Sequence, residues 1–229
     1  MIEVRDVSRV YHRGADEVHA LEHVSLRIER GRFAALMGPS GSGKSTLLNI
    51  LAGLDRPTSG VVEVAGQRLG DLSEDQLASF RARHVGFVFQ FFNLMPVLNA
   101  RDNVALPLLL TKLGKAERRT RAETALRVVG LADRADHKPG EMSGGEQQRV
   151  AIARAFVTDP EIVVADEPTG DLDAKNAVEI LALLRDLARE FGKTVVMVTH
   201  DPRGEAYVDE IHHLDKGVLL DSIQGGGGA

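Results

Sequence analysis

Phosphate binding is the chemistry that best suits one glycine-rich stretch of the chain, Gly38-Pro39-Ser40-Gly41-Ser42-Gly43-Lys44-Ser45-Thr46. Its glycines allow the backbone to wrap closely around an anion with its N–H groups pointing inward. Lys44 would supply a cation to the β- and γ-phosphates, and Ser45 would offer a hydroxyl to Mg²⁺. The stretch matches a phosphate-binding loop, so we expect all of it to contact a nucleoside triphosphate. Alone, it leaves kinases, GTPases, motor proteins and transport ATPases open.

A second group with catalytic chemistry is the pair Asp166 and Glu167, which follows the apolar run Ile162–Ala165. This run predicts a buried strand, and ligands sit at the carboxyl ends of strands in open α/β sheets. We therefore expect Asp166 to hold Mg²⁺, directly or through water, and Glu167 to polarise the attacking water. A strand that merely ends in solvated acids is the common alternative, but a phosphate-binding loop requires such an acidic partner.

Two further side chains, His200 and Gln90, follow predicted strands at 194–199 and 85–89. The imidazole of His200 could hydrogen-bond both the γ-phosphate and the attacking water, which makes it a catalytic candidate. The amide of Gln90 could bind Mg²⁺, position water or respond to the γ-phosphate. A lone histidine at a strand end is usually a surface residue, so both interpretations depend on the neighbouring motifs.

The elements that must position these residues alternate between strands and helices. Strands are predicted within 1–37 and at 58–66, 85–89, 162–165, 194–199, 211–214 and 218–221, and helices at 44–53, 74–83, 115–129, 145–157 and 174–191. Apolar strands that alternate with helices imply a parallel sheet covered on both faces. We therefore predict an α/β fold, a P-loop NTPase core with an N-terminal β part and a helical insertion. His12–Asp16 is expected to be a turn-rich link between two N-terminal strands.

We expect a single domain over residues 1–224. Its core is predicted to comprise 1–90 and 160–224, and its helical subdomain about 91–159, where the strand signal disappears. The glycine-rich tail 225–229 is expected to be flexible.

The composition is that of an ordinary globular protein and excludes several classes of function. The 229 residues carry a net charge of −5, with 43% apolar and 27% charged residues. This balance gives no footprint for nucleic acid, and the absence of cysteine excludes disulfides and thiolate metal sites. No apolar run approaches the roughly 18 residues that a membrane span needs, and the N-terminus lacks the pattern of a signal peptide. We expect a soluble, cytoplasmic chain, with any membrane part supplied by another chain.

The stretch Met142-Ser143-Gly144-Gly145-Glu146-Gln147-Gln148-Arg149 distinguishes among the classes of P-loop protein. It resembles the LSGGQ signature of ATP-binding cassette (ABC) proteins, with Met142 in place of the usual leucine and Glu146 in place of the usual glutamine. The order of the motifs along the chain, with Gln90 between the loop and the signature, is similar to that family as well. The resemblance covers nearly the whole chain and implies the ABC ATPase fold.

The resemblance implies an ATPase that uses ATP and Mg²⁺ and works as a head-to-tail dimer of two copies. Ser143, Gly144, Gly145 and Glu146 of one copy would close on the ATP held by the loop of the other. Gly170–Asp173 corresponds to the segment that crosses between the two sites. Tyr11 lies where the family places an aromatic ring against adenine, although a partly buried tyrosine at a strand end is the structural alternative.

A more detailed resemblance is to the small ATPases of the LolD/MacB type, and it is carried by Met37–Leu51, Gly53–Gly60, Gly86–Gln90 and Ala165–Asp173. That group works with membrane permeases in lipoprotein release, in efflux, or in the regulation of a periplasmic cell-wall hydrolase at division. The resemblance thus implies a subunit at the cytoplasmic face of the bacterial inner membrane.

A permease would dock near Phe91–Leu98, an apolar segment that could instead fill the joint between insertion and core. A third hypothesis, an ABC ATPase of DNA repair or translation, is disfavoured because the chain has neither a long coiled coil nor tandem cassettes.

Overall fold

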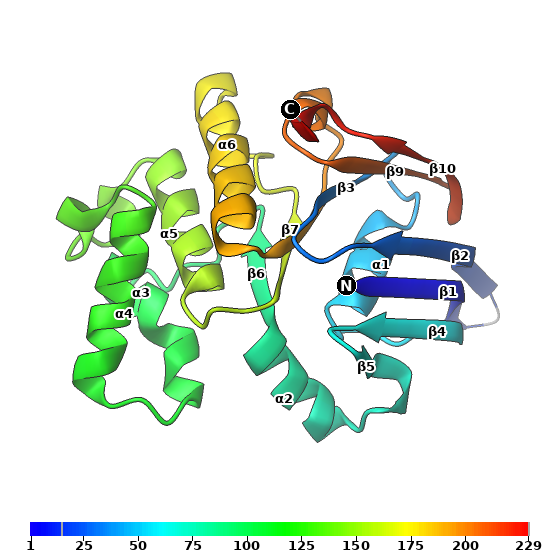
Figure 1. Cartoon of the computed structure of the whole chain (residues 1–229), viewed down its shortest axis with the longest axis horizontal. Coiled ribbons are helices and arrows are strands. Elements are labelled where there is room, and N and C mark those ends of the chain that lie inside the picture. The colour runs from blue at the N-terminus through cyan, green and yellow to red at the C-terminus, as the bar shows by residue number, and fades with distance from the viewer. Residues whose placement is uncertain (15, 229) are drawn as a thin grey trace.

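A six-stranded sheet forms the centre of the molecule in the computed structural model, which describes residues 1–14 and 16–228 (Figure 1). The spatial order of the strands is β10-β9-β3-β8-β7-β6. All neighbours are parallel except β10, which runs antiparallel to β9. The strands are β3 (Phe33–Met37), β6 (Val85–Phe89), β7 (Ile162–Asp166), β8 (Thr194–Val198), β9 (Glu210–Asp215) and β10 (Val218–Gln224).

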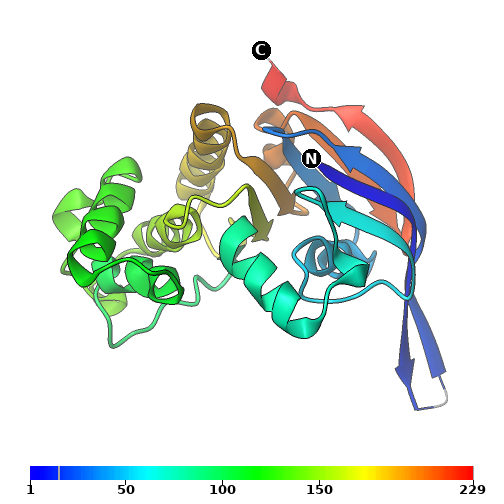
Figure 2. The same ribbon diagram turned by 60° about the horizontal axis from the view of Figure 1, so that its bottom comes forward.

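A second, four-stranded antiparallel sheet has the order β2-β1-β4-β5. It consists of β1 (Ile2–Arg13), β2 (Asp16–Ile28), β4 (Ser59–Val64) and β5 (Gln67–Arg68). The turn-rich link predicted at His12–Asp16 is too long, because β1 continues through Arg13 and β2 begins at Asp16. His12 pairs with Glu17 across this ribbon, and cross-strand pairing of this kind stabilises an extended hairpin. The end of the ribbon projects beyond the rest of the molecule in Figure 2.

Helices cover both faces of the central sheet. On one face, α1 (Lys44–Leu51) lies between the two sheets, and α2 (Glu74–His84) packs against the same core. On the other face lie α5 (Gly144–Phe156) and α6 (Ala174–Phe191). Alternate residues of β3 supply both cores: Ala34 and Leu36 face α1, whereas Phe33, Ala35 and Met37 face α5 and α6.

The helical part that α3 (Ala100–Ala105), α4 (Lys115–Val128) and α5 form lies to one side of the central sheet (Figure 1). Short 3-10 helices connect its elements at Leu106–Leu110, Ala132–Arg134 and Pro139–Glu141; others lie at Leu69–Asp71, Pro202–Ala206 and Gly226–Gly228. Helix α3 was not predicted, because it is only one and a half turns long and runs directly into the proline-containing 3-10 helix Leu106–Leu110.

A buried side chain, Asn103, and a partly buried one, Arg154, fasten the segment between β6 and α3. The amide of Asn103 donates to the carbonyls of Met95 and Leu98, both at 3.1 Å, and the Asn103 carbonyl oxygen accepts from the Met95 N–H at 2.7 Å. The guanidinium of Arg154 donates to the carbonyls of Phe92 and Asn93 at 2.8 and 2.6 Å. These bonds hold a loop that has little regular structure of its own.

The glycine-rich tail, which we expected to be flexible, has backbone partners in its described part. The N–H of Gly225 donates to Asp209 at 2.9 Å, and that of Gly227 donates to Val208 at 2.9 Å. Ala229 lies outside the described residues. No helix within residues 1–14 and 16–228 is long and apolar enough to cross a membrane.

Candidate active site

The register of the parallel strands brings the candidate site residues to one edge of the central sheet. Leu36 of β3 lies beside Val198 of β8, Val198 lies beside Asp166 of β7, and Asp166 lies beside Phe89 of β6. The phosphate-binding loop, His200, Glu167 and Gln90 each follow this row by one or two residues. Residues from four distant parts of the sequence therefore meet at the carboxyl edge of the sheet, where ligands bind in open α/β folds.

The loop that follows β3 has the backbone that a phosphate cradle requires. Gly43 precedes α1 with a φ of 95°, and a Cβ at this position would lie 2.4 Å from the carbonyl oxygen of Ala20. Only glycine fits such a close approach. The N–H groups of the first turn of α1 have no intrahelical acceptors, so they are available to an anion.

Lys44 lies inside this loop. Its Nζ donates to the carbonyls of Gly38 and Pro39 at 2.8 and 2.7 Å. Burial lowers the pKa of Lys44, and the nearby carboxylates of Glu167 and Asp166 partly oppose that shift. The cation is therefore already directed at the centre of the loop, where phosphates would bind.

Ser45 and Asp166 place two hard oxygen ligands at one point. The Ser45 hydroxyl donates to Oδ1 of Asp166 at 3.3 Å. Burial raises the pKa of Asp166, and the hydrogen bond from Ser45 partly offsets this effect. A partly desolvated carboxylate beside a hydroxyl is a donor set that suits a small divalent cation.

Glu167 and His200 form the second polar pair of the site. Nδ1 of His200 lies 2.9 Å from Oε1 of Glu167. Glu167 has a φ of 46°, which is unusual for a residue with a Cβ, and its N–H donates to the carbonyl of Val198 at 3.0 Å. A strained backbone of this kind persists where surrounding contacts determine it, and it is common in active sites.

Gln90 lies against the loop that follows Glu167. Its Nε2 donates to Oδ1 of Asp171 at 3.4 Å. A Cβ on Gly170 would lie 2.9 Å from the same nitrogen, so the glycine allows the Gln90 side chain to lie close to this loop. The Gln90 amide is thus held at the end of β6, beside the acidic pair Asp166 and Glu167 and beside Asp171.

Lys44, Ser45, Gln90, Glu167 and His200 line a cavity of about 630 Å³ at the sheet edge, whereas Asp166 is not among its lining residues. Among the residues predicted from the sequence, the cavity brings together Ser40, Gly41, Ser42, Gly43, Lys44, Ser45, Thr46, Gln90, Glu167 and His200. Sequence reasoning missed four further lining residues, Val198 of β8 and, on β2, Val18, His19 and Ala20. The three residues on β2 carried no signal, because only the fold shows that β2 passes over the loop.

Tyr11 lies on β1, opposite Val18 of the cavity wall. Its hydroxyl donates to Oδ2 of Asp55 at 2.6 Å, and the guanidinium of Arg9 lies 4.4 Å from the ring centroid. Arg9 also binds Asp55 through two nitrogens, at 2.7 and 3.1 Å. The ring is therefore fixed near the cavity, with a cation against it.

The signature lies apart from this cavity and lines its own polar hollow of about 390 Å³. Ser143 caps α5, and its hydroxyl accepts from the Glu146 N–H at 3.3 Å, while Oε2 of Glu146 accepts from the Ser143 N–H at 2.8 Å. The backbone bond from Ser143 lowers the pKa of Glu146, whose carboxylate also lies 3.2 Å from Arg134. Gly145 permits the close approach of Asn176, since a Cβ there would lie 2.4 Å from the Asn176 amide oxygen.

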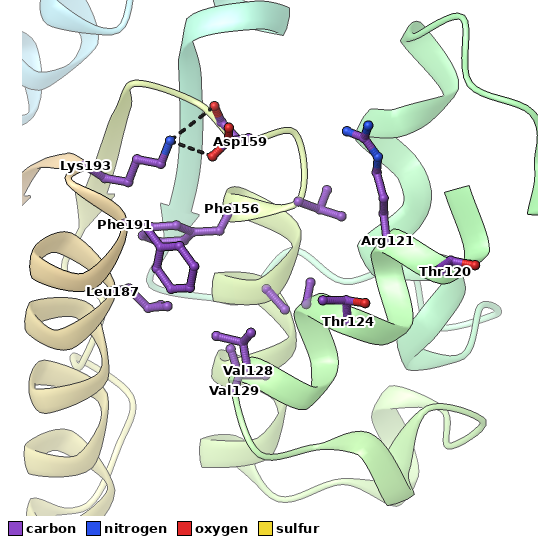
Figure 3. Close-up of a pocket in the computed structure, with 13 residues that line it drawn as sticks. Thr120, Arg121, Thr124, Val128, Val129, Phe156, Asp159, Leu187, Phe191 and Lys193 are labelled. Atoms are coloured by element: carbon purple, nitrogen blue, oxygen red, sulfur yellow. Dashed lines mark hydrogen bonds and ion pairs between the residues drawn. The ribbon is translucent and has the colours of Figure 1, made fainter. Parts of the chain in front are cut away.

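Two other hollows have apolar walls. One, of about 300 Å³, lies among α4, α5 and α6, with Val128, Phe156 and Phe191 directed into it and an ion pair of Lys193 and Asp159 at one end (Figure 3). The other, which we call the α2–β6 groove, has a volume of about 550 Å³. Its walls come from α2, β6, the 3-10 helix Leu106–Leu110 and the end of α5.

Comparison with known proteins identifies the family. Residues 21–170 match the family described as "ABC transporter". The lipoprotein-releasing system ATP-binding protein LolD of Chromohalobacter salexigens is 48% identical over 96% of this chain and 92% of its own length. The macrolide export ATP-binding/permease protein MacB 1 of Yersinia pestis is 44% identical over 96% of this chain, which spans only 34% of that relative.

A solved structure agrees with these matches. The post-hydrolysis dimer of the ATP-binding cassette MJ0796 with ADP and Pi superposes with a TM-score of 0.89 at 44% identity and covers 98% of each chain. The phosphate-binding loop, the acidic strand end and the separate signature all lie within the fold that these proteins share. The chain belongs to the ABC transporter family, as one of its ATP-hydrolysing subunits.

Proposed function

We propose that this chain powers a bacterial membrane transporter of the LolD/MacB type, in lipoprotein release or export. The observation that carries the proposal is that the phosphate-binding loop and the signature line two separate hollows. Each copy therefore presents half of a site on one surface and the complementary half on another. LolD and MacB both carry transport functions in their names, which favours transport over regulation of a cell-wall hydrolase.

Two copies would complete the sites by associating head to tail. The signature N-terminus of α5 has the free N–H groups and the positive dipole end that bind phosphate, and Ser143 adds a hydroxyl. Ser143, Gly144, Gly145 and Glu146 of one copy would then face the γ-phosphate held by the other. A dimer of the similar cassette MJ0796 provides the precedent for this arrangement.

Mg²⁺ fits the pair of Ser45 and Asp166, since this ion usually combines one or two carboxylates with substrate phosphates. The ion would neutralise charge on the phosphates of ATP, and Gln90 is our candidate for a further ligand. Glu167 would accept the proton of the attacking water at Oε2, because Oε1 already lies 2.9 Å from His200. His200 would hold Glu167 in place and hydrogen-bond the γ-phosphate. Lys44 would exchange its loop carbonyls for the β- and γ-phosphates.

The adenine would lie between the N-terminal sheet and the loop, with Tyr11 stacked on it. Arg9 and Asp55 hold the Tyr11 ring in one orientation, which reduces the entropy lost on stacking. Val18 and Ala20, at the cavity wall, would contact the nucleotide from β2.

A permease would dock on the α2–β6 groove and on the exposed part of Phe91–Leu98. Leu110 and Leu54 at the groove are 79% and 51% exposed, and Phe91 and Val97 of the neighbouring loop are each 71% exposed. Leu94 instead packs against the core, so only part of the apolar segment is available to a partner. Exposed apolar clusters of this kind mark interaction sites. The permease would hold the chain at the cytoplasmic face of the membrane.

We keep the proposed division into a core of 1–90 and 160–224 and a helical subdomain of about 91–159. The groove lies where these two parts meet, because it is lined by β6 from one and by α5 from the other. A partner seated there would contact both parts.

The test is reconstitution with a permease of the LolD/MacB type, in proteoliposomes that carry either a lipid-anchored protein or a macrolide. ATP-dependent release of the lipid-anchored protein would support the lipoprotein-release branch, and ATP-dependent macrolide transport would support the export branch. ATP hydrolysis that drives neither, but activates a cell-wall hydrolase, would contradict the proposal.

A further inference from the structure

A buried glutamine in the signature helix reaches both strand ends that carry the catalytic groups. Gln148 lies on α5, and its side chain is completely shielded from solvent. Its Nε2 donates to the carbonyl of Pro168 at 2.5 Å and lies 3.4 Å from the carbonyl of Phe89. Pro168 directly follows Glu167, and Phe89 directly precedes Gln90.

The amide of Gln148 directs its nitrogen at these two carbonyls, and this orientation leaves its oxygen without a partner in the described part of the chain. Within residues 1–14 and 16–228, Oε1 of Gln148 is buried without a hydrogen-bond partner. An unpartnered buried acceptor is costly and rare in native proteins. The side-chain bonds of Gln148 are thus the two that its nitrogen donates to Pro168 and Phe89.

The backbone that Gln148 fastens is strained. Glu167 adopts a φ of 46°, and a left-handed conformation in a residue with a Cβ persists only where several contacts determine it. The Glu167 N–H bonds Val198 on one side, and the N–H of Gly170 bonds the Glu167 carbonyl at 3.0 Å. Gln148 adds a bond to the next carbonyl along, from an element that begins at Ser143.

We propose that Gln148 is a positioning residue that aligns Glu167 and Gln90 with the signature helix. Its two donated bonds fix the end of β6 and the turn after β7 relative to α5. The carboxylate of Glu167 then meets the attacking water in a reactive geometry only when α5, and with it the signature, is in register with the sheet. This inference rests on the proposed role of Glu167 as general base.

The test is a double-mutant cycle of Gln148→Met and Glu167→Gln. Methionine has nearly the volume of glutamine, cannot donate, and removes the buried unpartnered oxygen, so the fold should be retained. In the otherwise unchanged chain we expect Gln148→Met to lower kcat at least about 10-fold, with the KM for ATP within about twofold, because a small displacement of a catalytic group is enough for this loss. In the Glu167→Gln background the same change should alter the residual rate by less than about twofold. Gln67→Met, which removes an amide that lies 3.5 Å from His84, serves as the control and should keep both kinetic constants.

The outcomes separate the possible failures. An equal loss of rate in both backgrounds, or an unchanged kcat in Gln148→Met, would overturn the positioning role. If the Glu167→Gln chain hydrolyses ATP at the unmodified rate, the general base itself has been misassigned. Should Gln148→Met not fold, Gln148→Asn repeats the cycle, because it keeps an amide but withdraws it from Pro168.

Discussion

The α2–β6 groove lies along the strand β6, whereas the nucleotide cavity lies beyond the carboxyl end of that strand, and the two differ in almost every physical property. The cavity is lined by the phosphate-binding loop, by Glu167 and His200, and by the amide of Gln90. It also contains the buried lysine of the loop and the strained backbone at Glu167. The groove is lined largely by aliphatic and aromatic side chains, with Arg81 and Arg154 bonded to backbone carbonyls. The polar residues of the cavity suit catalysis, and the apolar residues of the groove suit contact with a partner protein. Phe89 and Gln90, consecutive in the chain, line the groove and the cavity respectively, so a single peptide bond joins the two regions at this point.

The strongest way to sharpen this contrast is to remove chemistry from the cavity alone. Glu167→Gln should lower kcat by about 10²–10⁴-fold, because it removes the proposed general base while keeping size and hydrogen-bonding capacity. ATP binding should be retained, and two copies should remain associated in saturating MgATP. Hydrolysis assays together with light scattering measure both effects. A chain that loses ATP binding as well would place Glu167 in substrate binding instead.

Removing apolar surface from the groove should instead weaken association with the permease and leave ATP hydrolysis by the chain alone nearly unchanged. Leu110→Glu places a charge on a side chain that is 79% exposed at the groove, so a permease could seat it only by burying that charge. We expect at least about 10-fold weaker association with the permease. The ATPase rate of the chain alone should stay within about twofold. Val97→Glu, on the neighbouring loop, shows how far the contact surface extends. An equal loss of permease association and of ATPase rate would contradict a separate docking surface.

A smaller effect is expected from loosening the loop that joins the two regions. Asn103→Leu removes the hydrogen-bond partners of the Met95 N–H and of the Leu98 carbonyl and should destabilise the chain by about 1–3 kcal/mol. Urea unfolding followed by circular dichroism measures the change. The exposed substitution Lys112→Leu, two residues beyond the 3-10 helix, is the control and should change stability by less than about 0.5 kcal/mol. Unchanged stability in Asn103→Leu would mean that the loop does not depend on this anchor.

The smallest predicted effect is a dependence of metal binding on pH. Burial raises the pKa of Asp166, so its carboxyl takes up a proton at a higher pH than an ordinary aspartate as the solution is acidified. Since Mg²⁺ requires the ionised form, its affinity should begin to fall at a higher pH than for an exposed carboxylate, by a few-fold over one pH unit. Titration of Mg²⁺ at fixed ATP, compared with Asp166→Asn, isolates this group. A pH dependence that persists unchanged in Asp166→Asn would assign it elsewhere.

The sequence predicted the parallel sheet and the catalytic edge because both depend on local patterns. Buried runs such as Ile162–Ala165 predict strands, and the registered strand ends then bring Asp166 and the loop together. It could not predict that β2 covers the phosphate loop, or that Asn103 and Arg154 hold the segment after Gln90. Those features arise from contacts between distant residues, and an asparagine or arginine that anchors a loop has the same local pattern as one that faces solvent. The same limit hid Gln148, whose importance lies in the two carbonyls it reaches.

The hydrogen bonds of Lys44 have a consequence for turnover. Its ammonium already has the carbonyls of Gly38 and Pro39 as partners, so an arriving phosphate replaces existing bonds instead of satisfying a bare charge. The net gain on binding is the difference between two well-partnered arrangements, which is smaller than either. When the γ-phosphate departs, the same carbonyls are available to take the lysine back. A site with this internal competitor holds its nucleotide less tightly, and a motor that must release product in every cycle benefits from that weakness.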